Sequence, residues 1–166
     1  MLQVGVLTAS DKGSRGERED LSGALLRELV KDINGEVVVY AVLPDDRETL
    51  AAKMREWADE LRVDLILTTG GTGFSQRDVT PEATLDVTER LVPGIAEVMR
   101  AESLKVTPKA MLSRAMAGIR KYTLIINMPG SPKAVRECWT AIAPALNHGI
   151  EILKGEASEC AEPMQK

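Results

Sequence analysis

The sequence predicts an α/β protein in which a mostly parallel central sheet lies between two layers of helices. Short runs of β-branched and other apolar residues alternate with longer amphipathic stretches along almost the whole chain. The short runs are nearly continuously apolar, which is typical of strands that are buried on both faces. Strands that alternate with helices indicate βαβ units, so we expect a three-layer αβα architecture.

Four strands and five helices are expected. The strands are predicted at residues 2–8, 36–43, 64–69 and 122–127. Apolar residues at helical spacing mark the first two helices, with Leu21, Leu25, Leu29 and Ile33 in one and Leu50, Met54, Trp57 and Leu61 in the other. The remaining helices begin at Thr80-Pro81, Pro93-Gly94 and Ser131-Pro132, because proline is favoured in the first turn. Together these elements predict one domain over residues 1–154 and a loose tail over 155–166.

The composition excludes several classes of protein. A net charge of −4 argues against a protein that coats duplex nucleic acid, because phosphate neutralisation dominates such binding. No apolar run is long enough to span a membrane, and residues 1–8 lack the basic flank of a signal peptide. Cys138 and Cys160 form no CxxC motif and are expected to be reduced thiols. We therefore expect a cytoplasmic protein without nucleic-acid or membrane partners.

The loop after the third predicted strand is the most informative. In sheets of this kind, ligands bind at the carboxyl ends of the strands. Here Gly70, Gly71, Thr72 and Gly73 combine glycines that let a ligand approach the backbone with a hydroxyl donor, and Arg77 follows. These residues predict a phosphate site. Asp78 ends the loop and is compatible with a phosphate if Mg²⁺ lies between them. The alternative is a flexible turn in which Asp78 is only a helix-start acid.

The other strand-end loops leave more alternatives open. Asp45 is either the N-cap of the next helix, with Glu48 completing a capping box, or a carboxylate that shares a metal with Asp78. Ser10 and Asp11 repeat the pattern of hydroxyl and acid. The segment from Asn127 through Pro129, Gly130 and Ser131 is a rigid turn onto a helix. Away from these loops, Ser113-Arg114 with Arg120 and Lys121 is either an anion patch or a solvated surface, and these residues alone favour the surface.

At these residues the chain resembles the molybdenum-cofactor biosynthesis family typified by bacterial MogA and MoaB, whose domain also occurs in gephyrin. The resemblance covers residues 4 to about 154 and is most specific in the long string from Gly70 to Glu82. The matching motifs are Ser10-Asp11, Asp20-x-Ser22-Gly23, Pro44-Asp45, Gly70-Gly71-Thr72-Gly73, Arg77-Asp78-Val79-Thr80-Pro81-Glu82, Leu112-Ser113-Arg114 and Asn127-x-Pro129-Gly130-x-Pro132.

The resemblance implies a homotrimeric enzyme that transfers AMP from ATP to molybdopterin with Mg²⁺. Asp45 and Asp78 match the family's paired essential aspartates, which would hold the metal. The resemblance further implies that the Gly70–Gly73 backbone lines the nucleotide, with Ser10 and Asp11 at the same binding site. Ser113, Arg114 and the segment from Asn127 to Ser131 would contact the pterin side. The alternative within the family is a MoaB-like trimer that binds molybdopterin without transferring AMP.

Overall fold

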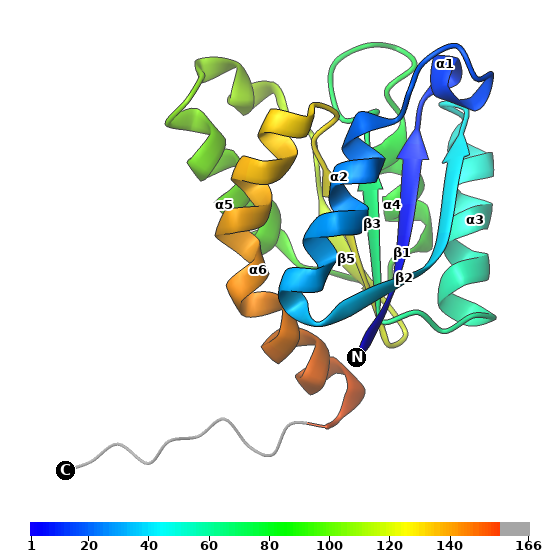
Figure 1. The fold of residues 1–166 in the computed structure, drawn as a ribbon, viewed down its shortest axis with the longest axis vertical. Helices are drawn as coiled ribbons and strands as arrows, with labels where there is room; N and C mark the ends of the chain where they lie inside the picture. The colour runs from blue at the N-terminus through cyan, green and yellow to red at the C-terminus, as the bar shows by residue number, and fades with distance from the viewer. Residues whose placement is uncertain (157–166) are drawn as a thin grey trace.

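The structure, a computed structural model, describes residues 1–156 and contains one six-stranded sheet in the order β2-β1-β3-β6-β5-β4 (Figure 1). The strands are β1 Leu2–Ala9, β2 Gly35–Leu43, β3 Leu65–Thr69, β4 Arg90–Leu91, β5 Ala117–Arg120 and β6 Thr123–Met128. β1 pairs in parallel with β2 and β3, and β3 with β6. β5 and β4 are antiparallel to their neighbours at one edge. The sheet is therefore mostly parallel, as predicted.

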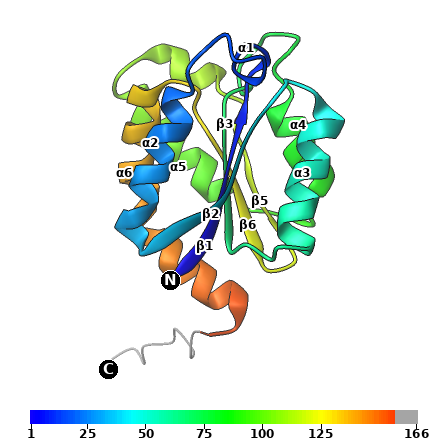
Figure 2. The ribbon, with the colours of Figure 1, turned by 45° about the vertical axis from the view of Figure 1, so that its right-hand side comes forward.

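Helices cover both faces of this sheet. They are α1 Asp11–Ser14, α2 Leu21–Leu29, α3 Arg47–Asp59, α4 Thr80–Val87, α5 Pro93–Leu104 and α6 Pro132–Lys154, with 3-10 turns η1 Val30–Ile33 and η2 Pro108–Leu112. Figure 2 shows α2, α5 and α6 on one side of the sheet and α3 and α4 on the other. This arrangement confirms the three-layer αβα prediction.

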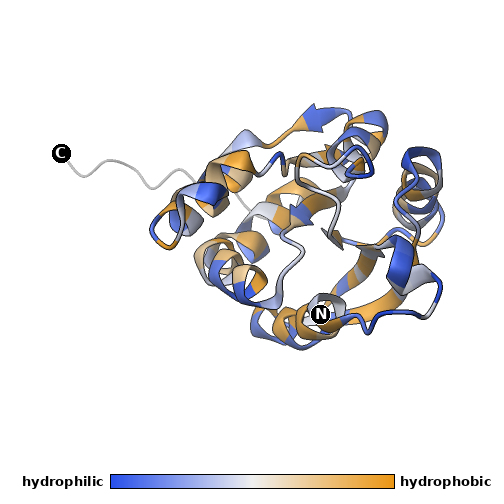
Figure 3. Ribbon diagram, turned by 90° about the horizontal axis from the view of Figure 1, so that it is seen from above, coloured by the Kyte–Doolittle hydropathy of each residue, from blue (hydrophilic) through white to orange (hydrophobic). Residues whose placement is uncertain are grey.

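The hydrophobic core consists of two clusters, one on each face of the sheet. Side chains alternate along a strand, so Leu65 and Leu67 pack toward α2, α5 and α6 while Ile66 between them packs toward α3 and α4. All three are fully buried. Viewed from above, the helices turn their hydrophobic residues toward the sheet and their hydrophilic residues outward (Figure 3). Burial on both faces explains why these strands are continuously apolar in sequence.

The sequence prediction missed two strands and extended two helices too far. β4 and β5 are short, and the hairpin from β5 to β6 turns through Lys121 and Tyr122, without the glycine or asparagine that usually marks such a turn. Leu21 and Leu61, predicted on helix faces, are 56% and 46% exposed. Leu61 lies beyond the end of α3. The predicted Leu29 and Ile33 are buried, although Ile33 lies in the 3-10 turn that follows α2, and Leu26 is buried with them.

The last helix ends where the predicted domain ends. α6 runs to Lys154, and Gly155 follows it in the left-handed conformation that commonly closes a helix. The rest of the predicted tail, residues 157–166 with Cys160, lies outside the described residues. Among the helices of residues 1–156, none combines the length and the hydrophobicity needed to cross a bilayer.

The strand order fixes where a ligand crevice opens. From β1 the chain goes to β2 on one side, and then returns past β1 to β3 on the other. The loops that leave β1 and β3 therefore diverge toward opposite helix layers and leave a gap at the carboxyl edge of the sheet. Ser10 directly follows β1 and Gly70 directly follows β3, so both lie at this gap.

Candidate functional site

A cleft of about 540 Å³ opens at the carboxyl edge of the sheet, and we call it the strand-end cleft. All four predicted loops contribute to it, although they are far apart in the sequence. The lining includes Ser10 and Gly13 from the first loop, Asp45 from the second, Gly70, Gly71 and Asp78 from the third, and Gly130 and Pro132 from the fourth. The fold thus brings together most of the segments that the sequence singled out.

The glycine turn forms one wall of the cleft. Gly70 and Gly71 have φ values of 88° and 68°, which side-chain-bearing residues rarely adopt. A Cβ atom on Gly70 would lie 2.5 Å from the carbonyl oxygen of Ala9. A Cβ atom on Gly71 would lie 2.4 Å from the Thr80 hydroxyl and 3.2 Å from Asp45 Oδ1. Only glycine fits at these two positions, and the backbone is thereby left bare beside the Asp45 carboxylate.

Asp45 is not the cap of α3. That role belongs to Asp46, whose carboxylate accepts from the Thr49 amide at 2.9 Å. Asp45 and Asp11 instead hold each other reciprocally: the amide of each donates to the carboxylate of the other at 3.0 Å. Burial, together with the negative charges of Asp11 and Asp78, raises the pKa of Asp45 above its usual value. The carboxylates of Asp45 and Asp78 repel each other, and both residues line the same cleft.

Asp78 is likewise not a helix cap. The N-cap position of α4 is Val79, which makes no side-chain cap bond, while Asp78 Oδ2 accepts from the Ser75 amide at 3.0 Å. Within residues 1–156 no group of three or more acidic, cysteine or histidine side chains forms a metal cage. Two carboxylates facing one cleft fit Mg²⁺, which typically uses one or two protein carboxylates, several waters and substrate phosphates. The two aspartates therefore suit a metal that arrives with a phosphate ligand.

Arg77 and Asp11 form an ion pair that joins the third loop to the first. The Arg77 guanidinium donates to both oxygens of Asp11, at 2.9 and 3.0 Å, and Arg77 is 63% exposed. This pairing, followed by the bond from the Asp45 amide, lowers the pKa of Asp11. The prediction that Arg77 offers its fork to phosphate is therefore not what the structure contains, because that fork is bound to Asp11.

The fourth loop divides into a buried support and an exposed turn. Asn127 is fully buried; its amide donates to the hydroxyls of Thr68 and Thr84 at 3.0 and 2.8 Å, and its oxygen accepts from the Met116 amide at 3.2 Å. Its carboxamide is thus occupied inside the protein, and Asn127 is not among the residues that line the strand-end cleft. Further along, Pro129 accepts from Thr69, Gly130 lines the cleft, and Ser131 caps α6.

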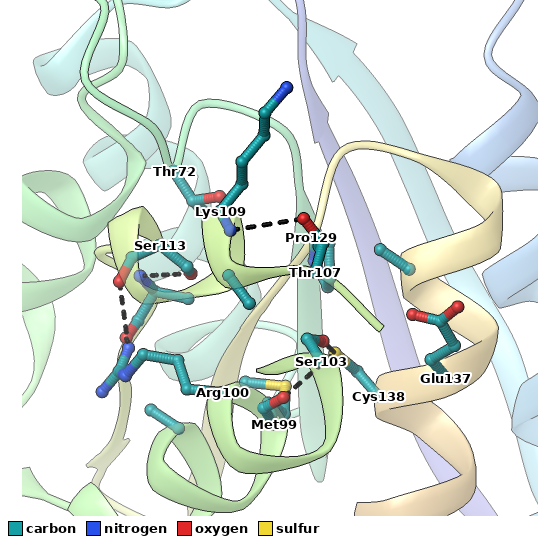
Figure 4. A pocket seen from close by; sticks show the side chains of 14 residues that line it. Thr72, Met99, Arg100, Ser103, Thr107, Lys109, Ser113, Pro129, Glu137 and Cys138 are labelled. Carbon is teal, nitrogen blue, oxygen red and sulfur yellow. Dashed lines mark hydrogen bonds between the residues drawn. The ribbon is translucent and has the colours of Figure 1, made fainter. Parts of the chain in front are cut away.

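A second cavity of about 220 Å³, which we call the side pocket, lies between α5, η2 and α6 (Figure 4). Ser113 lines it together with Thr72 and Pro129. Gly71, which precedes Thr72, and Gly130, which follows Pro129, line the strand-end cleft. The two cavities are therefore separated by one thin wall. Ser113, whose local sequence indicates only a solvated surface, lies on the side-pocket side of this wall.

Arg114 and its basic neighbours do not form an anion patch. The Arg114 guanidinium donates to the carbonyl oxygens of Gly73 and Asp78, at 2.8 and 2.7 Å, and to the Glu82 carboxylate. Arg120 pairs with Asp59 at 2.6 Å, and Lys121 reaches the same carboxylate at 3.0 Å. The guanidinium on which the predicted pterin contact would depend is bound to the glycine loop and to Glu82.

Asp20 lies in the cleft although local sequence favours a solvated helix entry. Its carboxylate caps α2 through the Gly23 amide and also accepts from the hydroxyls of Thr8 and Tyr40, at 2.6 and 2.5 Å. Desolvation, with the Asp20 bond, raises the pKa of Tyr40 to about 12. The signal in the sequence is Gly23, where a Cβ atom would overlap the Asp20 carboxylate.

The fold and the cleft together define a three-layer α/β protein with a ligand-sized cleft at the carboxyl edge of a mostly parallel sheet, lined by two aspartates. Residues 5–148 match the family model described as a probable molybdopterin binding domain, and the chain belongs to that family. A molybdopterin adenylyltransferase from Helicobacter pylori is 42% identical over 163 residues, covering 97% of this chain and 93% of the relative.

Two further relatives extend the comparison. Gephyrin from Dictyostelium discoideum is 45% identical over 163 residues, which cover 92% of this chain and 23% of gephyrin. Among solved structures, the molybdopterin biosynthesis enzyme MoaB from Thermus thermophilus has a TM-score of 0.88 and 48% identity, covering 93% of this chain and 98% of that one. The family resemblance read from the sequence motifs is confirmed.

Proposed function

We propose that this protein is a molybdopterin adenylyltransferase of molybdenum cofactor biosynthesis, which uses ATP and Mg²⁺ and releases pyrophosphate. Relatives that bear this name cover nearly the whole chain. The observation that carries the proposal is the meeting of Asp45 and Asp78 in one cleft with the bare Gly70-Gly71 backbone. Neither carboxylate is used as a helix cap, and each accepts one backbone amide through Oδ2, which leaves Oδ1 of each for a ligand.

The reaction joins the terminal phosphate of molybdopterin to the α-phosphorus of ATP. A P–O bond forms to the acceptor phosphate, and the bond from the α-phosphorus to the bridging oxygen breaks as pyrophosphate leaves. A phosphate nucleophile is already ionised at neutral pH, so the site requires no general base. This agrees with a cleft lining that contains no histidine. Catalysis then depends on positioning and charge neutralisation.

The residues of the cleft divide this task. Asp45 and Asp78 would hold Mg²⁺, which neutralises phosphate charge when it is bound. Gly70 and Gly71 allow the nucleotide phosphates to approach the backbone closely. The amino ends of α2 and α6 reach the cleft at Leu21 and Pro132, and helix amino ends favour anions. Ser113 and Thr72 in the side pocket would face the pterin across the shared wall.

The test is incubation with molybdopterin, Mg²⁺ and ATP labelled at the α-phosphate. We expect label on the pterin and an equal amount of pyrophosphate, and loss of at least about 100-fold in rate for Asp78→Asn, because charge stabilisation is removed. Asp86→Asn, which removes an acid of α4 that pairs with Arg47 of α3 outside the cleft lining, is the matched control and should retain the rate. Pyrophosphate formed without an acceptor would indicate nucleotide hydrolysis instead. Binding of molybdopterin without label transfer would indicate a binding trimer.

We also infer a cytoplasmic homotrimer. What supports self-association is an apolar groove between α5 and α6, lined by Val92, Ile95, Val98, Ile119, Leu146 and Leu153. The buried free thiol of Cys138 is compatible with a reducing compartment. Light scattering on the purified protein would give the mass of a trimer, and cell fractionation would give the compartment. A monomer at micromolar concentration would contradict the assembly.

A further inference from the structure

Arg114 makes four hydrogen-bonded contacts to one short stretch of chain. Its backbone amide donates to Thr72 O at 2.9 Å, and its guanidinium binds Gly73 O, Asp78 O and the Glu82 carboxylate. These partners belong to the loop that carries Asp78 and to the helix that follows it. The planar fork of an arginine can satisfy several acceptors in fixed directions at once, which a lysine cannot do.

We propose that Arg114 is a positioning residue that holds Asp78 and the glycine loop in place from behind, rather than a residue that binds the substrate. The inference rests on the proposed function, in which Asp78 holds the metal. The Asp78 carbonyl accepts from Arg114 while Asp78 itself lines the strand-end cleft. Bonds to the carbonyls on both sides of the loop, at Gly73 and Asp78, fix the width of the loop and the direction of Asp78.

The electrostatic setting keeps the Arg114 guanidinium at this position. Glu82 lies on α4, and its second oxygen is buried without a hydrogen-bond partner. Burial opposes ionisation of Glu82, but the bond and the charge of Arg114, together with a backbone hydrogen bond and the charge of Arg47, lower the pKa of this carboxyl overall. If the guanidinium swung toward a ligand, an ionised and partly buried carboxylate would lose its counter-ion. The Arg114 guanidinium therefore stays bound to the loop and is not available to a phosphate ligand.

The second anchor of the loop is weaker. Arg77 ties the loop to Asp11 on the opposite side, but this ion pair is largely exposed, and exposed pairs contribute little. The side chains of Arg114 and Glu82 are only 33% and 35% exposed. The Arg114 contacts should therefore dominate the order of residues 72–79.

Arg114 also links the loop to the side pocket. Ser113 precedes it, and Arg100 fixes this segment by donating to the carbonyls of Ser113 and Ala115, at 3.3 and 2.8 Å (Figure 4). Ser113 lines the side pocket, and the next residue holds the loop of the metal-binding aspartate. A ligand that orders Ser113 would thus order Asp78 through a single peptide unit.

The test compares Arg114→Lys with Arg120→Lys. Lysine keeps the charge beside Glu82 but loses the fork. We expect hydrogen exchange of the amides in residues 72–79, followed by mass spectrometry, to accelerate about tenfold in Arg114→Lys. The Kd of Mg²⁺·ATP should rise about tenfold, while the Kd of molybdopterin alone stays within about twofold. The effect on Mg²⁺·ATP should largely vanish in an Asp78→Asn background, because two residues that act through one group are not additive.

Arg120→Lys is the matched control, because Arg120 also forks onto a carboxylate and a carbonyl, those of Asp59 and Val87, at the far end of the sheet. It should lower the melting temperature without altering exchange at 72–79. If Arg114→Lys does not fold, Glu82→Gln replaces it and should accelerate the same exchange about twofold to threefold. Unchanged exchange with weakened molybdopterin binding would overturn the proposal. If Arg114→Lys accelerates hydrogen exchange at residues 72–79 but the wild-type protein transfers no AMP, the positioning role of Arg114 stands and the proposed function is rejected.

Discussion

At the scale of the residue, the adjacent aspartates Asp45 and Asp46 have different roles. Asp45 and Asp46 occupy consecutive positions after β2, and either could cap α3 on the evidence of local sequence. The structure gives the cap to Asp46, which is exposed, and places Asp45 against the Asp11 amide inside the strand-end cleft. Consecutive positions thus hold a carboxylate that lines the cleft and one that caps a helix.

This division predicts opposite effects of two neighbouring substitutions. Asp46→Ala should lower the free energy of unfolding by about 1 kcal/mol, because it removes an N-cap, and should leave AMP transfer nearly unchanged. Asp45→Asn should reduce kcat/KM by at least about 100-fold, because it removes charge from the site, with a much smaller loss of stability. Urea denaturation and the labelled-ATP assay measure the two effects. Equal losses of activity in both variants would contradict the assignment.

At the scale of the element, sequence alone placed the loops better than the side chains within them. The four parallel strands were predictable because burial on both faces makes them continuously apolar, and their order in the chain brings their loops to one edge. β4 and β5 were not predictable from the sequence, because these short edge strands have no β-branched run and no turn signal. Whether Arg77, Arg114 and Asn127 face a ligand or the protein depends on partners 11 to 66 positions away, as in Asn127 with Met116 and Arg77 with Asp11.

Asn127 shows how a motif residue supports the site without touching it. Its carboxamide joins β3, α4 and the segment before β5 through Thr68, Thr84 and Met116. Asn127→Leu, of similar size, would leave these buried groups unsatisfied, so we expect a loss of about 2–4 kcal/mol in the free energy of unfolding. Thr140→Val removes an exposed hydrogen bond from a hydroxyl group on α6 and should change the free energy of unfolding by less than about 0.5 kcal/mol. If Asn127→Leu were as stable as the wild type, the network would not matter for folding.

At the scale of the whole molecule, charge is organised differently at the two ends of the sheet. The carboxyl edge gathers the acids of the cleft, where burial first, and then the negative charges of Asp11 and Asp78, raise the pKa of Asp45. The opposite edge balances its acids with bases: Asp59 binds Arg120 and Lys121, and Asp64 binds Lys154 of α6. The proposed function assigns the acids of the first end to a cation, whereas the ion pairs of the other end tie the end of the last helix to the sheet.

The balanced end predicts a particular loss of stability in acid. The bond from Arg120 lowers the pKa of Asp59 to about 2, below the value of about 3.9 in an unfolded chain. Asp59 therefore stabilises the fold above pH 4, and this contribution disappears as the pH falls from about 4 toward 2. We expect about 1 kcal/mol, reduced by solvent screening at a side chain that is 27% exposed. Urea denaturation at several pH values should give Asp59→Asn a shallower dependence on pH than the wild type in this range.

The strand order also dictates when the cleft can exist during synthesis. β1 is the first element of the chain but an interior strand of the finished sheet, with β2 on one side and β3 on the other. Its hydrophobic residues must wait for partners that end at Thr69, and the wall around Gly130 needs β6 and the start of α6 as well. Contacts this distant in sequence form slowly compared with local ones. About four-fifths of the chain must therefore leave the ribosome before the strand-end cleft can form, so a ligand of this cleft cannot template the early folding.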